Sequence, residues 1–203
     1  MHFALMTLGS VPSQAEPMAV VGVGPRIGVD SPLHEKSIEP VEFFHLLGIG
    51  PRIGIGGDSF LGKEQKEDFR QYDLAATFRL PWGWRHRASG WGLEGRFLAS
   101  AGELVAAGDT GLMATLVPML ALTSRNGGIA IDAGTGVAFF SNYQFGVQDF
   151  GGPAQIIGTA GIGFNLYEGF HAGYRFQHFS DAGMYGPTSL GVDMHILDMS
   201  YVF

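Results

Sequence analysis

The stretch Phe69-Arg-Gln-Tyr-Asp-Leu-Ala-Ala-Thr-Phe-Arg-Leu80 alternates between apolar side chains and polar or small ones. Its apolar set is Tyr72, Leu74, Ala76, Phe78 and Leu80, and its polar set is Gln71, Asp73, Thr77 and Arg79. Successive side chains of a β-strand point to opposite faces, so the two sets occupy opposite faces of one strand. The stretch therefore predicts a strand that is apolar on one face and polar on the other.

The same period of two recurs along the chain and predicts eight strands. They cover residues 47–57, 69–80, 91–102, 111–123, 128–140, 154–166, 169–180 and 193–203. Each is close to the roughly 9 to 11 residues that a tilted strand needs to cross a bilayer, and the even number suits closure. The alternative fold is a soluble lipocalin-like barrel, which turns its polar residues outward. Here polar residues such as Asp132 share the inner face with glycines. The expected fold is an all-β, eight-stranded antiparallel transmembrane β-barrel of the outer-membrane type.

The inner face is expected to carry charges that need partners. Glu94 and Arg96 fall on the inner face of the third strand, and Asp73 and Arg79 on that of the second. Buried charges are costly unless they are paired. We therefore expect Glu94 and Arg96 to pair with Asp73 and Arg79 inside the barrel.

Composition supports this class and excludes others. The 203 residues are 46% hydrophobic and 15% charged, with 32 Gly and no Cys, and no apolar run is long enough for a membrane-spanning helix. The net charge of -7 argues against a nucleic-acid surface. Without Cys there is neither a thiol nucleophile nor a cysteine-rich metal site, and the sparse His offers no ligand cluster, so we expect no cofactor and no metal.

The connections between the predicted strands differ in length. Short or moderate turns fall at 81–89, 124–127 and 167–168, and mostly longer polar loops at 58–68, 103–110, 141–152 and 181–192. In outer-membrane barrels the short turns face the periplasm and the long loops face the cell exterior. The last strand ends with Leu197, Met199, Tyr201 and Phe203 on one face, and this terminal aromatic residue is typical of outer-membrane barrels.

The N-terminal part is expected to lie outside the barrel. Residues 1–15 resemble a truncated secretory signal, with an apolar core and a small-residue cleavage site at Ala15. The sequence determines the structure of the N-terminal segment 16–46 poorly, and 47–203 are expected to form the barrel. An eight-residue near-repeat, Gly22 to Val29 and Gly48 to Ile55, is too short for a solenoid, and we interpret its second copy as strand.

The seventh predicted strand carries residues that suit nucleophilic catalysis. His178 and Ser180 are two positions apart, so their side chains share the face of Phe170, Tyr174 and Phe176. A serine hydroxyl needs a base to take its proton, and the imidazole needs a carboxylate that orients it. Asp193, with outward parity on the adjacent strand, is the candidate acid. An accidental pair of rim residues is the alternative, because ionisable groups near the membrane interface cost only about 0 to 1 kcal/mol.

The sequence Arg175-Phe-Gln-His-Phe-Ser-Asp-Ala-Gly183, followed by Gly186-Pro187 and Gly191-Val-Asp193 before an aromatic terminus, resembles the PagL family of outer-membrane lipid A 3-O-deacylases. The resemblance implies an eight-stranded barrel in the bacterial outer membrane. It also implies a carboxylic ester hydrolase that removes the 3-linked acyl chain of lipid A, in lipopolysaccharide, through a triad on its outer surface. His178 would be the general base, Ser180 the nucleophile and Asp193 the orienting acid.

Two departures from the family pattern concern this site. The family usually has Glu where Asp193 stands, and commonly Asn where Asp181 follows the serine. An ionised Asp181 cannot donate a hydrogen bond to an oxyanion, so the backbone N–H groups of Ala182 and Gly183 are the candidate oxyanion donors. His195 is an alternative base or a rim residue that reaches the headgroups.

Two further functions stay open from the residues alone. One is a non-catalytic small barrel that binds ligands or serves a structural role, and the other is an outer-membrane phospholipase that uses the same three residues on a glycerol ester. Nothing in the sequence specifies an oligomeric state, an acyl-chain preference or the substrate-binding residues.

Overall fold

The computed structural model describes residues 44–57, 60–61, 65–167, 169–186 and 190–203. The chain divides into two units, Met1–Ile38 and Glu39–Phe203, and every described residue belongs to the second. The predicted signal segment, the first copy of the repeat and all but the last three residues of 16–46 lie outside the described residues. Within the described part, no helix is long and apolar enough to cross a membrane.

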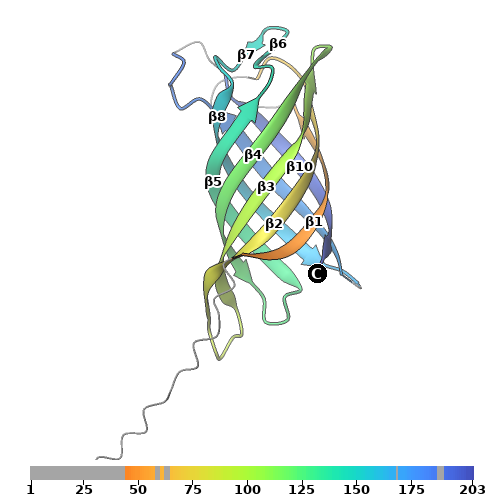
Figure 1. Ribbon diagram of the computed structural model, residues 1–203, viewed down its shortest axis with the longest axis vertical. Helices are drawn as coiled ribbons and strands as arrows, with labels where there is room; N and C mark the ends of the chain where they lie inside the picture. The colour runs from red at the N-terminus through yellow and green to blue at the C-terminus, as the bar shows by residue number, and fades with distance from the viewer. Residues whose placement is uncertain (1–43, 58–59, 62–64, 168, 187–189) are drawn as a thin grey trace, which may run out of the picture. The chain divides into compact units, whose positions relative to one another are not determined.

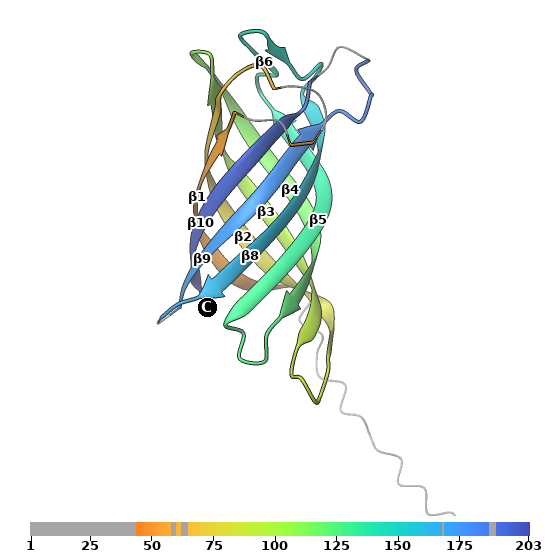
Figure 2. The same cartoon turned by 180° about the vertical axis from the view of Figure 1, so that it is seen from behind.

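The second unit is a closed barrel of eight antiparallel strands, as predicted (Figures 1 and 2). The strands run in the order β1-β10-β9-β8-β5-β4-β3-β2, and β2 pairs with β1 to close the cylinder. Their bounds are β1 His45–Gly56, β2 Phe69–Arg85, β3 Gly92–Ala106, β4 Asp109–Thr123, β5 Ile129–Phe140, β8 Ala154–Asn165, β9 Phe170–Ser180 and β10 Val192–Val202. All eight predicted strands are present, and the second copy of the repeat lies in β1.

Burial follows the predicted alternation. In β4 the residues from Gly111 onward alternate between buried and exposed, with Leu112, Leu116, Leu120 and Leu122 exposed and Thr115 buried. Tyr72, Leu74, Ile131 and Phe164 are likewise exposed, whereas Asp73, Asp132 and Thr159 are buried. The barrel therefore has an apolar outer wall and a lumen that contains polar side chains.

The ion pairs of the lumen differ in part from the prediction. Glu94 lies 3.3 Å from Arg79, as expected, and it also pairs at 2.6 Å with Arg96 of its own strand, which was not predicted. Asp73, however, pairs with Arg52 of β1, whose Nε and Nη2 donate to the two carboxylate oxygens at 2.7 and 2.6 Å. The expected contact of Asp73 with the β3 charges is wrong, because the register sets Asp73 opposite Arg52 on one side and Gly102 on the other.

Two predicted connections are shorter than expected. Residues 103–110, predicted as one of the longer polar loops, belong mostly to β3 and β4, which are joined by Ala107 and Gly108. Both turn residues have positive φ, 52° and 85°, as tight turns between twisted strands require. The turn 81–89 is shortened because β2 continues to Arg85 past an irregular register between Arg79 and Gly83. In β2, Pro81 and Gly83 mark an irregularity within the strand and not its end.

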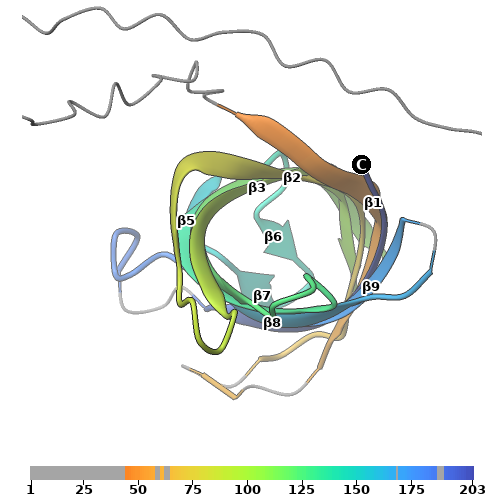
Figure 3. The same cartoon turned by 90° about the horizontal axis from the view of Figure 1, so that it is seen from below.

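The end of the barrel with the longer loops contains a buried cluster of aromatic side chains. The segment predicted as the loop 141–152 contains a short hairpin, β6 Gln144–Phe145 with β7 Gln148–Asp149, which lies across this end of the barrel (Figures 1 and 3). Its buried Phe145 and Phe150 pack with Phe69 and Phe140. Phe140 also contacts Phe179 edge-to-face at 5.2 Å, so this cluster supports β9 from behind.

Candidate functional site

His178 and Asp193 contact each other on the outer wall, near the end with the longer loops. They are direct partners in the antiparallel pairing of β9 with β10, so their side chains emerge side by side. His178 Nδ1 lies 2.5 Å from Asp193 Oδ1. Asp193 is only 1% exposed, whereas His178 is half-buried. Because the carboxylate accepts from Nδ1–H, it selects the tautomer in which Nε2 is free to accept a proton.

Ser180 lies on the same wall as His178, at the last position of β9. Its side chain is half-buried, as is that of His178, whereas the intervening Phe179 is fully buried in the lumen. Ser180 Oγ accepts a hydrogen bond from the Ala182 N–H at 3.1 Å. Within the described residues, no hydrogen bond joins Ser180 Oγ to His178. The structure thus brings His178 and Asp193 together and places Ser180 on the same wall, with its Oγ directed at its own turn.

The backbone turns sharply after Ser180. Ala182 and Gly183 both have positive φ, 50° and 83°. This conformation costs a non-glycine residue such as Ala182 on the order of 1 to 3 kcal/mol, and such strain is concentrated at functional sites. Asp181 stabilises the turn because its carboxylate accepts from the Gly183 N–H at 3.0 Å and the Tyr185 N–H at 2.9 Å.

The two candidate oxyanion donors therefore differ in their present partners. The Ala182 N–H points at Ser180 Oγ. If this oxygen attacks an ester, the oxyanion forms on the carbonyl oxygen close to it. The Gly183 N–H already donates to Asp181, so this placement does not direct it at the reacting atoms. Asp181 itself holds the turn through its bonds to the N–H groups of residues 183 and 185.

Part of this site was not predicted from the sequence. The second carboxylate oxygen of Asp193 accepts from the N–H groups of Phe60 and Leu61, in the segment between β1 and β2. Backbone N–H donors cannot be recognised from the alternation of apolar and polar side chains along a strand. The only signal was an apolar Phe-Leu pair in an otherwise polar connection.

His195 is engaged with neighbouring aromatic residues. Its Nδ1 lies 2.6 Å from Tyr174 Oη, and its ring stacks on Tyr174 and meets Phe176 edge-on. The ring is exposed on the outer wall two positions beyond Asp193. This placement matches a rim residue, and His178 alone of the two histidines bonds to Asp193 among the described contacts.

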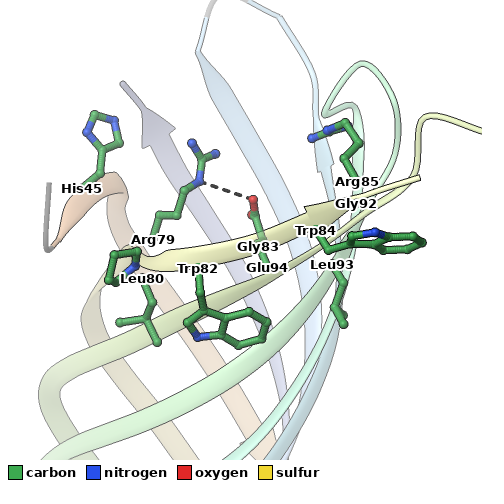
Figure 4. A pocket seen from close by; sticks show the side chains of 11 residues that line it. His45, Arg79, Leu80, Trp82, Gly83, Trp84, Arg85, Gly92, Leu93 and Glu94 are labelled. Atoms are coloured by element: carbon green, nitrogen blue, oxygen red, sulfur yellow. Dashed lines mark ion pairs between the residues drawn. The ribbon is translucent and has the colours of Figure 1, made fainter. Parts of the chain in front are cut away.

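A separate hollow of about 590 Å³ lies at the opposite end of the barrel (Figure 4). Arg79 points across it toward Glu94, and Trp82 and Trp84 lie along its edge on β2. None of the residues that line it belongs to the His178 group. In the described part of the chain, no three His, Asp or Glu side chains are grouped as a metal site would require.

Comparisons with known proteins agree with this architecture. A family model described as "Lipid A 3-O-deacylase (PagL)" matches residues 70–202, which include His178, Ser180 and Asp193. A curated protein of Bordetella bronchiseptica, "Lipid A deacylase PagL", is 36% identical over 73 residues. That match spans 36% of this chain and 40% of the relative's length.

A solved structure shares the fold. It is described as the crystal structure of the outer membrane enzyme PagL, and it superposes with a TM-score of 0.59 at 22% sequence identity. The superposition covers 74% of this chain and 97% of that structure.

Proposed function

The chain belongs to the PagL family of lipid A 3-O-deacylases, and on that premise we propose that it hydrolyses the 3-linked acyl ester of lipid A in the bacterial outer membrane. Ser180 is the nucleophile, His178 the general base and Asp193 the residue that orients the base. The observation that carries this assignment is the 2.5 Å contact of His178 Nδ1 with Asp193 Oδ1, on the same outer face as Ser180.

The first half of the reaction forms an acyl-enzyme. Ser180 rotates about χ1 so that its hydroxyl donates to His178 Nε2, which takes the proton as Oγ attacks the carbonyl carbon. The resulting oxyanion lies near the Ala182 N–H, which points at Oγ before the reaction. When the tetrahedral intermediate collapses, the bond from the carbonyl carbon to the sugar oxygen breaks. His178 donates its proton to that oxygen, and the sugar leaves with a free 3-hydroxyl group.

Water completes the cycle. His178 removes a proton from a water molecule, which attacks the acyl-enzyme, and the proton then returns to Ser180 as the fatty acid leaves. Asp193 stabilises the positive charge that the imidazole carries in each half-reaction. Its other oxygen is held by two backbone N–H groups, so the carboxylate stays fixed throughout the cycle.

The position of the site suits an amphipathic substrate. The outer wall near His178 is formed by side chains such as Phe176, Ile156 and Tyr174, of which the latter two are exposed. A lipid in the adjacent leaflet reaches this wall by lateral diffusion, with its acyl chains along the apolar surface and its ester near the rim. The buried aromatic cluster behind Phe179 leaves β9 little freedom to move during the reaction.

Replacement of Ser180 by Ala tests this function. We expect release of 3-hydroxy fatty acid from purified lipopolysaccharide to cease, as measured by mass spectrometry, while the barrel keeps its folded mobility on a gel. Ser89→Ala is the matched control, because Ser89 Oγ lies 3.0 Å from a histidine, His86, outside the proposed site. Full activity of Ser180→Ala would remove the serine from the mechanism. Faster release from phospholipid vesicles than from lipid A would point to a phospholipase instead.

A further inference from the structure

The carboxylate of Asp193 is held by a part of the chain that is distant in sequence. Its Oδ2 accepts from the N–H groups of Phe60 and Leu61, at 2.5 and 2.6 Å. Its Oδ1 contacts His178 Nδ1. Three N–H donors therefore surround one carboxylate whose side chain has no solvent exposure. A buried charge needs such partners, and these three directions leave the carboxylate one orientation.

The same segment is fastened to the backbone of Asp193. Gln65 is buried, and its Oε1 accepts from the Asp193 N–H at 3.0 Å while its Nε2 donates to Glu67 O at 3.0 Å. Gly56, at the end of β1, allows this close approach. A Cβ at Gly56 would lie 2.3 Å from Asp193 O and 3.2 Å from Gln65 Nε2. The backbones at Gly56 and Asp193 therefore approach each other too closely for any residue larger than glycine at position 56.

A second buried glutamine connects this segment to the base. Gln148 of β7 accepts from the Lys66 N–H at 2.9 Å through Oε1, and its Nε2 donates to Gly191 O at 2.9 Å. Gly191 in turn lies against the imidazole, because a Cβ there would be 3.1 Å from His178 Cε1. Gln148 therefore links the segment that holds the acid to the residue that lies beside the base.

The side chain of Phe60 places this segment on the outer wall. Its ring meets Phe176 edge-to-face at a centroid distance of 6.0 Å, and Phe60 is 82% exposed. An exposed aromatic ring at this position suits contact with lipid, while the N–H of the same residue points at Asp193. Phe60 thus meets Phe176 on the outer wall with its ring and the buried carboxylate with its N–H group.

We propose that the described residues between β1 and β2 form a positioning element of the catalytic site. The N–H groups of Phe60 and Leu61 hold Asp193 in the orientation that directs His178 toward Ser180, and Gln65 and Gln148 are the positioning residues that keep these groups in place. This inference rests on the proposed function. It also explains how an aspartate serves where the family usually has a longer acid.

The test replaces each glutamine by Met, which is similar in size but lacks the amide. Gln65→Met and Gln148→Met are assayed with lipid A in vesicles. We expect kcat to fall roughly 10-fold, because small misplacements of catalytic groups have effects of this order or larger, and KM to stay unchanged. Gln155→Met is the control, since Gln155 is equally buried but bonds to Phe150 O and Gly152 O. It should keep the normal rate.

A double-mutant cycle separates positioning from general support. In an Asp193→Ala background, Gln65→Met should not lower the residual rate further if Gln65 acts through Asp193. A further 10-fold loss there would overturn the inference, and so would normal kcat in both glutamine variants. The two variants are made separately, so that one that fails to fold leaves the other to decide. An inactive Ser180→Ala alongside fully active glutamine variants would refute the positioning role alone, whereas an active Ser180→Ala would refute the proposed function.

Discussion

His178 and Asp193 are direct partners across the β9–β10 pair, and their side chains meet at 2.5 Å although 14 residues lie between them. The register of two strands sets this contact, so the acid does not depend on the conformation of the loop that joins them. The contact occupies Nδ1, so Nε2 is the nitrogen that would take the Ser180 proton in the proposed mechanism.

Asp193→Asn should lower kcat by about 10³- to 10⁴-fold, because an amide in this position no longer stabilises the imidazolium or selects the tautomer with a free Nε2. The loss is measured as the initial rate of fatty-acid release from lipid A. The folded mobility of the barrel on a gel should not change. A decrease of less than 10-fold would show that Asp193 is not the orienting acid.

Asp193→Glu should lower kcat roughly 10-fold, although Glu is the residue that the family usually carries. The extra methylene would push the carboxylate against the Phe60 and Leu61 N–H groups, which fit the shorter side chain. Steady-state kinetics on the same vesicles measures the effect. Wild-type kcat in this variant would mean that these groups adapt to either acid.

Gly191→Ala should slow catalysis about 10- to 100-fold through displacement of His178. The new Cβ would lie 2.6 Å from Phe179 O and 3.1 Å from His178 Cε1, so the backbone or the imidazole must shift. Gly158→Ala is the matched control, since Gly158 pairs with His178 on the other side and its Cβ would meet nothing within 4 Å. Equal losses in the two variants would contradict this explanation.

Ala182→Gly should raise stability slightly but lower kcat several-fold. Glycine adopts a φ of 50° without the steric strain of alanine, and the loss of this strain stabilises the folded state by on the order of 1 kcal/mol. The greater conformational freedom of glycine in the unfolded chain partly offsets this gain. The more flexible N–H is then a poorer oxyanion donor. Ala107→Gly is the control, because Ala107 has a similar φ of 52° in the β3–β4 turn.

Both alanine variants should shift the urea unfolding midpoint alike, and only Ala182→Gly should change the rate. An unchanged kcat in Ala182→Gly would argue that the Ala182 N–H does not stabilise the oxyanion.

Arg52→Met should destabilise the barrel by about 3 to 5 kcal/mol, because it leaves the Asp73 carboxylate buried without its counter-ion. Arg52 is 3% exposed and donates to both oxygens of Asp73 as well as to Ser100. Urea unfolding in bilayers measures the loss. Replacement of the half-exposed Arg79, whose pair with Glu94 is longer, should cost about 1 kcal/mol or less. A smaller loss of stability for the Arg52 variant than for the Arg79 variant would contradict the conclusion that Arg52 neutralises a buried carboxylate.

The strands could be predicted because a barrel wall separates two environments. Residues 69–75 alternate between exposed side chains such as Tyr72 and Leu74 and buried polar ones such as Gln71 and Asp73, so the period of two shows directly in the sequence. In 111–123 burial follows the same period, although Met113, Val117 and Met119 on the inner face are apolar as well. The prediction failed where this rule ends. Near the longer loops Phe145, Phe150 and Phe179 are buried inside the barrel. A rule that expects polar side chains inside does not predict these positions.

Within the candidate site, parity in the sequence was sufficient to put His178 and Ser180 on one face, and the hairpin brought Asp193 beside them. The roles of these residues stay predictions, as does the choice of oxyanion donor. The structure distinguishes the Ala182 and Gly183 N–H groups, because the carboxylate of Asp181 occupies only the second. That difference depends on a turn conformation, which strand alternation does not describe.

By itself the sequence determined the closed eight-stranded wall, the outward direction of the three proposed catalytic side chains, and the family. Only the tertiary structure decided what holds Asp193 in place, because its partners Phe60, Leu61 and Gln65 lie about 130 residues away and use mainly backbone groups. Local side-chain patterns record whether a residue faces lipid or lumen. Contacts between loops arise only after the strands have closed and brought distant backbone groups within hydrogen-bonding distance.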